Sequence, residues 1–306
     1  MKFSVWPSFE RPWHELLNFA RHVDGGESGD WHCLWFADHY MMDRPDGSVS
    51  DDPGLECWAT VGALAAVTSR VRLGTLVAPT TVHHPAILAN RAATIDQISG
   101  GRFILGLGAG WQVNEHTAYG IELFEAGDRV TRFDEAIQIT RMLLSQPRST
   151  FAGRFFSVTD APCEPKPIQS PLPILVGTSG PRMSRIAARW ADEWNVWGTP
   201  ERVKTASVVM DAALEQEGRS PAKLRRSAQA LVFMVDDPAV AEKIRANAPA
   251  DRSLVGSPAQ LTEMIGQYKE LGIDEFILPD FTLGKSAQQR TDTYDRFWSE
   301  VAVHLL

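Results

Sequence analysis

Residues 71–107 read VRLGTLVAPTTVHHPAILANRAATIDQISGGRFILGL and contain one complete strand–helix–strand unit. Val71 to Val77 is rich in β-branched and apolar residues, which is typical of a buried strand. Pro85 stands where a first helical residue is expected, and Gly100-Gly101 ends that helix. Arg102 to Leu107 is the next apolar run. Two strands joined by a single helix predict a parallel pair in an α/β sheet.

The same alternation of short strands and longer helical stretches continues along the chain and gives eight units in all. The other six predicted strands are Lys2 to Trp6, Cys33 to Ala37, Ile174 to Val176, Glu193 to Trp197, Ala230 to Val235 and Glu275 to Leu278. Further helices are predicted over Pro12 to about Val23, Glu56 to Val67, about Arg129 to Leu144, and Pro258 to Leu271. Eight consecutive units favour a (β/α)8 TIM barrel over a doubly wound sheet, which usually has fewer strands.

A proline-rich segment interrupts this pattern after the fourth strand and its helix. Ser145 to Pro173 contains six prolines and the strand-like run Arg154 to Val158. Such a composition is typical of an inserted hairpin and loop. With 306 residues and no break in composition elsewhere, we expect one domain, residues 1–306, with an insertion at about residues 145–173.

Charge and cysteine content exclude several classes of protein. The 30 Lys and Arg against 38 Asp and Glu give a net charge of -8, which disfavours a nucleic-acid partner. The three cysteines, Cys33, Cys57 and Cys163, form neither a disulfide framework nor a zinc pattern, so we expect a reducing, cytoplasmic location. No run approaches the ~18 apolar residues of a membrane span. No metal site is expected, because His14-Glu15 lacks a second histidine four residues after the first.

Polar and glycine-rich segments follow several of the predicted strands. In a barrel the active site is built from the loops at the C-terminal ends of the strands, so these segments are expected to share one pocket. They are Asp38-His39-Tyr40, Thr80 to His84, Gly108 to Trp111 with Asn114-Glu115, Gly177 to Pro181, and Trp197-Gly198.

The segment Gly177-Thr178-Ser179-Gly180-Pro181 opens directly into a helix. Free backbone N–H groups and the positive end of a helix both favour a phosphate, and glycine lets the backbone approach it closely. A plain helix start at Gly180-Pro181 is the alternative interpretation. By contrast, Gly106 to Gly110 is no dinucleotide fingerprint, because its third glycine falls one position early and the unit is the fourth. A tight turn that passes close to a planar group is the expectation there, and a turn without a ligand would use the same glycines.

Asp38-His39 is a candidate acid/base pair, because imidazole titrates near neutrality and a carboxylate can fix its tautomer. Neighbouring residues on a strand point to opposite faces, so only one of the two is expected to reach the pocket, and a structural histidine is the alternative. His84 is predicted to cap the helix that Pro85 begins.

Taken together, Leu34 to His39, Val71 to Pro85, Gly101 to Gly120 and Glu164 to Asn195 resemble the luciferase-like flavin-dependent oxidoreductases. The resemblance implies an eight-fold barrel with an insertion after strand four and a coenzyme lying across the strand ends. It also implies a cis peptide at Leu76-Val77 beneath the coenzyme ring, a phosphate near Gly177 to Pro181, and a homodimer. The residues implied to contact the coenzyme are Asp38, His39, Thr75, Leu76, Val77, Gly108, Ala109, Gly110, Asn114, Gly177, Thr178, Ser179, Gly180 and Trp197.

Within that family, Asp38-His39 and the Gly108 to Trp111 turn look most similar to the branch that uses the deazaflavin coenzyme F420. The sugar-phosphate dehydrogenases of that branch carry a glutamate where Trp111 stands and a tryptophan where Asp43 stands, so their substrate is not transferred to this chain. We therefore expect hydride transfer between F420 and a small organic substrate, with His39 handling the proton.

The expected catalytic residues are His39, Asp38 and Glu115. An FMN-dependent monooxygenase is the alternative, because it would share the same fold. A non-catalytic flavin-binding protein and a hydrolase using Asp38 with Glu115 are two further readings of the same residues.

Overall fold

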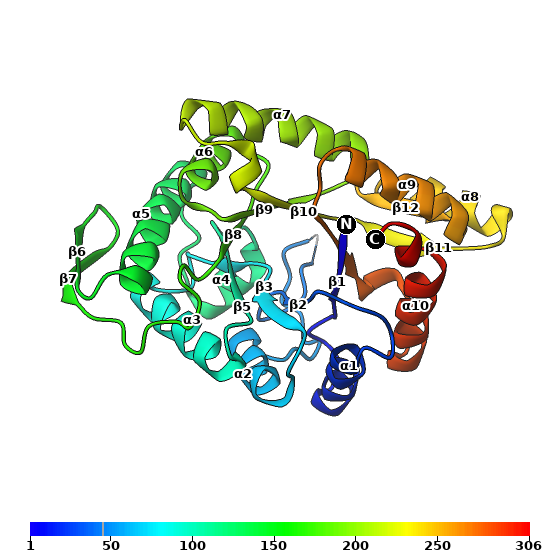
Figure 1. The fold of residues 1–306 in the computed structure, drawn as a ribbon, viewed down its shortest axis with the longest axis horizontal. Helices are drawn as coiled ribbons and strands as arrows, with labels where there is room; N and C mark the ends of the chain where they lie inside the picture. Colours follow the sequence, from blue (N-terminus) through cyan, green and yellow to red (C-terminus); the bar gives the residue numbers. More distant parts are fainter. Residues whose placement is uncertain (45) are drawn as a thin grey trace.

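Eight parallel strands close into a barrel in the computed structural model, which describes residues 1–44 and 46–306 (Figure 1). The barrel strands are β1 (Lys2–Trp6), β2 (Cys33–Phe36), β3 (Arg72–Thr75) continued by β4 (Ala78–Pro79), β5 (Phe103–Gly108), β8 (Ile174–Gly177), β9 (Glu193–Trp197), β10 (Arg225–Gln229) and β13 (Glu275–Pro279). The barrel closes because β1 pairs with β13 and β3 pairs with β5. The predicted (β/α)8 TIM barrel is confirmed.

Helices cover the outside of the barrel (Figure 1). They are α1 (Trp13–Gly25), α2 (Cys57–Val67), α3 (Pro85–Ser99), α5 (Ala126–Ser145), α6 (Pro181–Trp190), α7 (Pro200–Gln216), α8 (Pro238–Asn247), α9 (Pro258–Glu270) and α10 (Ala287–Glu300). The short helix α4 (Val113–Tyr119) lies inside this ring, in the connection between β5 and α5. The start of α3 is as predicted, since the His84 ring accepts a hydrogen bond from the backbone N–H of Ala86 at 3.2 Å. Its end is also as predicted, because Gly100 takes up the left-handed conformation at φ 66°. Within the described residues, no helix has both the length and the apolar character that a bilayer crossing needs.

The seventh barrel strand differs from the prediction. Ala230 to Val235 was expected to fill this place, but β10 (Arg225–Gln229) does so, and β11 (Leu231–Met234) pairs with β12 (Ser253–Gly256) in a separate two-stranded sheet. The apolar sequence of β11 is typical of a barrel strand, whereas β10 begins with two arginines. Those charges are tolerated in the barrel because Arg225 pairs with Glu193 and Arg226 pairs with Asp211.

The insertion forms an antiparallel hairpin of β6 (Ser149–Ala152) and β7 (Ser157–Ala161), which stands away from the barrel in Figure 1. The strand predicted at Arg154 to Val158 is therefore displaced toward the C-terminus. The reason is the buried Glu135 carboxylate of α5, which accepts hydrogen bonds from the backbone N–H groups of Arg154, Phe155 and Phe156 at 2.8, 2.8 and 3.0 Å. These three residues form the turn because their N–H groups bond to a side chain instead of a neighbouring strand.

Charged side chains close the N-terminal end of the barrel, where the strands begin. Arg225 lies 3.2 Å from a carboxylate oxygen of Glu193 and 3.6 Å from one of Glu275. Burial raises the pKa of the Glu193 carboxyl to about 7, and Arg225 opposes this rise only in part. Burial, together with the positive charges of Lys2 and Arg225, lowers the pKa of the His32 imidazole to about 3. This end of the barrel is therefore closed by paired charges, and a ligand site is expected at the opposite, C-terminal end.

The raised pKa of Glu193 predicts a pH-dependent stability. Because the pKa is higher in the folded protein than the ordinary 4.5, the carboxyl contributes stability at low pH that is lost as the pH rises from about 4.5 through about 7. Glu193→Gln should flatten the fall in melting temperature between pH 5 and pH 8, measured by thermal unfolding followed by circular dichroism. The exposed Glu201→Gln is the control and should keep the pH dependence of the unmodified protein. Identical slopes for Glu193→Gln and the unmodified protein would contradict this account.

Candidate functional site

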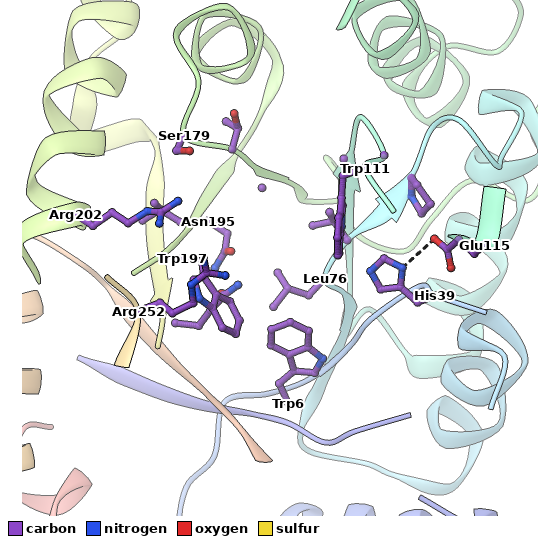
Figure 2. Close-up of a pocket in the computed structure, with 18 residues that line it drawn as sticks. Trp6, His39, Leu76, Trp111, Glu115, Ser179, Asn195, Trp197, Arg202 and Arg252 are labelled. Atoms are coloured by element: carbon purple, nitrogen blue, oxygen red, sulfur yellow. Dashed lines mark hydrogen bonds and ion pairs between the residues drawn. The ribbon is translucent and has the colours of Figure 1, made fainter. Parts of the chain in front are cut away.

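A cavity of about 420 Å³ lies at the C-terminal ends of the barrel strands (Figure 2). Many of the residues predicted for the site line it: His39, Leu76, Val77, Gly108, Gly110, Glu115, Gly177, Thr178, Ser179 and Trp197. Trp111, which ends the predicted Gly108 to Trp111 segment, also lines it. Other lining residues were not in the predicted site: Trp6, Pro79, Asn195, Val196, Arg202, Gln229 and Arg252. The loops after strands two, four, five and six therefore meet in one place, as the barrel requires.

The floor of the cavity is the end of the third barrel strand. The Leu76-Val77 peptide is cis, as the family resemblance implied. Two glycines of β5 allow this segment to lie close. A Cβ at Gly106 would lie 1.9 Å from the carbonyl oxygen of Thr75, and a Cβ at Gly108 would lie 2.6 Å from the Val77 side chain. The glycines predicted to permit a close approach therefore do so for the neighbouring strand. The apolar side chains of Leu76 and Val77 line the cavity beside them.

One end of the cavity holds a histidine–glutamate pair (Figure 2). His39 Nδ1 lies 3.0 Å from Glu115 Oε1, and the second carboxylate oxygen accepts the backbone N–H of Tyr40 at 2.9 Å. The Glu115 side chain is 2% exposed and that of His39 is 21% exposed. Trp111 stands edge-on to the imidazole, with 5.6 Å between ring centroids. An ionised carboxylate can only accept, so this bond places the proton of a neutral His39 on Nδ1 and leaves Nε2 as the nitrogen that can accept a proton.

Asp38 does not line the cavity, although it was predicted as a catalytic and coenzyme-contacting residue. Its carboxylate is buried and accepts hydrogen bonds from Trp58 Nε1 and from His83 Nε2, both at 2.8 Å. Arg91 lies 3.3 Å from the other ring nitrogen of His83. Asp38 and His39 thus face opposite ways, as the alternation along a strand predicted, and only His39 reaches the cavity.

Further residues predicted to contact the coenzyme also lie outside the cavity lining: Thr75, Ala109, Asn114 and Gly180. Thr75 uses its hydroxyl to exchange hydrogen bonds with the backbone of Gly106 at 2.8 and 2.9 Å. Gly180 is the N-cap of α6, as the alternative interpretation of this segment, a plain helix start, predicted. Gly177 to Ser179, in contrast, line the cavity.

The other end of the cavity is polar and positively charged (Figure 2). Arg202 from α7 and Arg252 from the segment before β12 line it, and both pair with Asp251, Arg252 at 3.1 Å. Hydrogen bonding to Arg252 lowers the pKa of the Asp251 carboxyl. Within the described residues, the buried indole N–H of Trp197 and the buried carbonyl oxygen of the Gln229 side chain have no hydrogen-bond partner. Buried polar groups normally have partners, so this end of the cavity is suited to a polar ligand.

Sequence reasoning missed the two arginines for different reasons. Arg202 lies in the first turn after the sixth barrel strand, so the rule that sites form at strand ends could have found it. Arg252 precedes β12, which lies outside the barrel and was not predicted. Nothing in the spacing of strands placed that residue near the site.

The sequence profile of the luciferase-like monooxygenases matches residues 1–250. The chain belongs to the luciferase-like monooxygenase family. It is therefore an oxidoreductase of that family, as the resemblance of its strand-end motifs indicated. The match ends at residue 250, so Arg252 and β12 both lie beyond the part that the profile covers.

Among related luciferase-like proteins is the F420-dependent glucose-6-phosphate dehydrogenase of Kineococcus radiotolerans. It is 33% identical over 261 residues, which are 82% of this chain and 74% of that protein. An F420-dependent secondary alcohol dehydrogenase, solved with an F420-acetone adduct, shares the fold at a TM-score of 0.81, with 21% identity over 98% of this chain and 99% of the other. A monooxygenase from Streptomyces bottropensis shares it at a TM-score of 0.80, with 22% identity and full coverage of both chains.

The position of Asp38 in this luciferase-like chain predicts a structural role for its side chain. Asp38→Ala would leave Trp58 Nε1 and His83 Nε2 buried without an acceptor, so we expect a loss of roughly 1–3 kcal/mol in the free energy of unfolding. Urea denaturation measures this loss. Asp43→Ala removes an exposed carboxylate from the following segment and should change the stability little. Equal stabilities for the two variants would show that the Asp38 contacts contribute nothing.

Proposed function

We propose that this protein transfers a hydride between the deazaflavin coenzyme F420 and a small organic substrate, with His39 moving the accompanying proton. The observation that carries the proposal is the His39–Glu115 pair beside the apolar cavity floor formed by Leu76 and Val77. The relative from Kineococcus radiotolerans, which is named as F420-dependent, supports the choice of coenzyme.

The cavity fits a ring joined to an anionic tail. Leu76, Val77 and Gly108 present an apolar surface on which a planar ring can lie. Gly177 to Ser179 present backbone amides just before α6, where the positive end of the helix dipole favours a phosphate. The unpartnered N–H of Trp197 is a donor that a polar group in the cavity would satisfy. We therefore assign the ring to the floor and the phosphate to the Gly177 to Ser179 turn.

His39 supplies the acid/base chemistry in this proposal. When bound, F420 supplies a ring carbon that accepts or donates the hydride. Oxidation of an alcohol to a carbonyl also releases the hydroxyl proton, which His39 Nε2 is free to take because Nδ1 is already protonated and bonded to Glu115. The Glu115 carboxylate then stabilises the imidazolium through a charge-assisted hydrogen bond. In the direction of carbonyl reduction, the same nitrogen returns the proton.

Arg202 and Arg252 give the cavity a preference for negative charge at the end away from His39 (Figure 2). They share one carboxylate, Asp251, so one positive charge is left over. Because the two arginines and Asp251 are partly exposed, their mutual attraction is weak and a ligand anion can compete for the guanidinium groups. We propose that this end receives an acidic group, carried by the coenzyme tail or by the substrate.

An FMN-dependent monooxygenase is the second candidate. The family is named for monooxygenases, and the monooxygenase from Streptomyces bottropensis has the same fold. Both coenzymes place a planar ring and a phosphate in one cavity, so the fold does not separate them. Fluorescence titration of the purified protein with each coenzyme does. The homodimer implied by the family resemblance also stays a prediction, which sedimentation velocity would test.

The role of His39 predicts a specific loss of turnover. His39→Ala should lower the rate of F420 reduction by at least ~100-fold, because the hydroxyl proton of the alcohol no longer has an acceptor. The rate is measured by the loss of F420 absorbance with the best alcohol from a substrate panel. His304→Ala, which removes an exposed histidine near the C-terminus, is the control and should leave the rate unchanged.

Near-normal turnover in His39→Ala would remove this residue from the mechanism. Turnover with reduced FMN and oxygen, in the absence of any reaction with F420, would favour the monooxygenase instead.

A further inference from the structure

Asn114 is a buried amide that uses both ends of its side chain. It is 2% exposed and lies in the first turn of α4. Its Nδ2 donates to the backbone carbonyls of Met42 at 2.9 Å and Ser48 at 3.1 Å. Its Oδ1 accepts from Gln112 Nε2 and from the backbone N–H of Glu115, both at 2.9 Å. All four contacts are made to the protein, so none of this capacity remains for a ligand.

The neighbours of Asn114 bind the same stretch of backbone after β2. Gln112, which is 1% exposed, donates to the carbonyl of Met41 at 2.8 Å. Glu115 accepts the N–H of Tyr40 at 2.9 Å and bonds to the His39 ring at 3.0 Å. Side chains from one short segment, residues 112–115, thus hold consecutive residues 39–42.

We propose that Asn114 is a positioning residue that fixes the Glu115 carboxylate against His39 and so sets the tautomer of the imidazole. This inference rests on the proposed function, in which His39 needs a free Nε2. Asn114 orients Glu115 through the backbone N–H of that residue, and it fixes the position of the His39 segment through the carbonyl of Met42. If either contact were lost, the Glu115 carboxylate and the His39 imidazole would no longer be held at hydrogen-bonding distance.

An amide is the side chain that this position requires. Aspartate has nearly the same shape and keeps the two acceptor contacts, but it cannot donate to the carbonyls of Met42 and Ser48. It would instead place a carboxylate oxygen against two carbonyl oxygens in a buried environment, where unpaired polar groups are costly. Asn114→Asp therefore removes the hydrogen bonds to the segment after β2 but keeps the hydrogen bond to the Glu115 N–H. It tests the contacts to the segment after β2 separately from the contact to Glu115.

The experiment measures the His39 tautomer directly in the protein without coenzyme. Histidine labelled with ¹⁵N gives separate signals for protonated and unprotonated ring nitrogens, and His39 is assigned by the signal that disappears in His39→Gln. In the unmodified protein at a pH where His39 is neutral, we expect Nδ1 protonated and Nε2 unprotonated. In Asn114→Asp we expect a mixture of both tautomers. The matched control is Asn90→Asp, at an exposed amide of α3 that donates to the carbonyl of Ala86, and it should give the spectrum of the unmodified protein.

A second measurement separates positioning from coenzyme contact. Because Asn114 does not line the cavity, the dissociation constant for F420 in Asn114→Asp should stay within ~3-fold of that of the unmodified protein, whereas loss of a direct polar contact typically costs tenfold or more. A single Nδ1-protonated tautomer in Asn114→Asp would overturn the proposal, whatever the affinity for F420. A weaker binding of ~10-fold or more would also overturn it, in favour of direct contact.

If Asn114→Asp fails to fold, Asn114→Ala decides on the same two readouts, because it removes the contacts to the Met42 carbonyl and to the Glu115 N–H without burying a charge. Because the tautomer of His39 is measured without coenzyme, the positioning role of Asn114 is tested independently of the proposed F420-dependent function. If the unmodified protein itself binds no F420, a shifted tautomer in Asn114→Asp would support the positioning role and contradict the proposed function.

Discussion

The hydrogen bond between His39 Nδ1 and the Glu115 carboxylate joins two segments that are 76 residues apart in the sequence. One segment follows β2 and the other begins α4 after β5, so the bond forms only when β2, β3 and β5 lie side by side with their C-terminal ends on the same side. The bond couples the fold to the chemistry proposed here, because it decides which imidazole nitrogen can exchange a proton.

The barrel separates structural charges from functional ones along its axis. At the N-terminal end, the buried carboxylates of Glu193 and Glu275 pair with the partly exposed Arg225. A small apolar layer fills the interior between the two ends, made by Cys33, Trp35, Leu76, Ile104, Leu175 and Ile277. Leu76 belongs both to this layer and to the cavity floor, so the surface on which we place the coenzyme ring is the top of the barrel core. A floor of this kind is rigid because its side chains are packed on every other side.

Much of the fold could be predicted because most strands have apolar patterns that end in glycine or a polar motif. The pattern failed at β10, whose arginines are paired with acidic neighbours that only the folded chain brings near, and at β11, whose apolar sequence serves a separate small sheet. In the site, strand alternation indicated that one of Asp38 and His39 would reach the cavity, but which one follows from Trp58 and His83, distant residues that bind the Asp38 carboxylate. Arg252 lay beyond prediction because its position depends on the β11–β12 pairing.

The central claim is that a planar redox ring lies on the Leu76-Val77 floor with its reactive carbon next to His39. A crystal structure of the protein with F420 tests it most directly. The account predicts the ring in contact with Leu76 and Val77, the phosphate bonded to the amides of Gly177 to Ser179, and His39 Nε2 facing the substrate side of the ring. A ring bound elsewhere, or a phosphate held away from that turn, would contradict it.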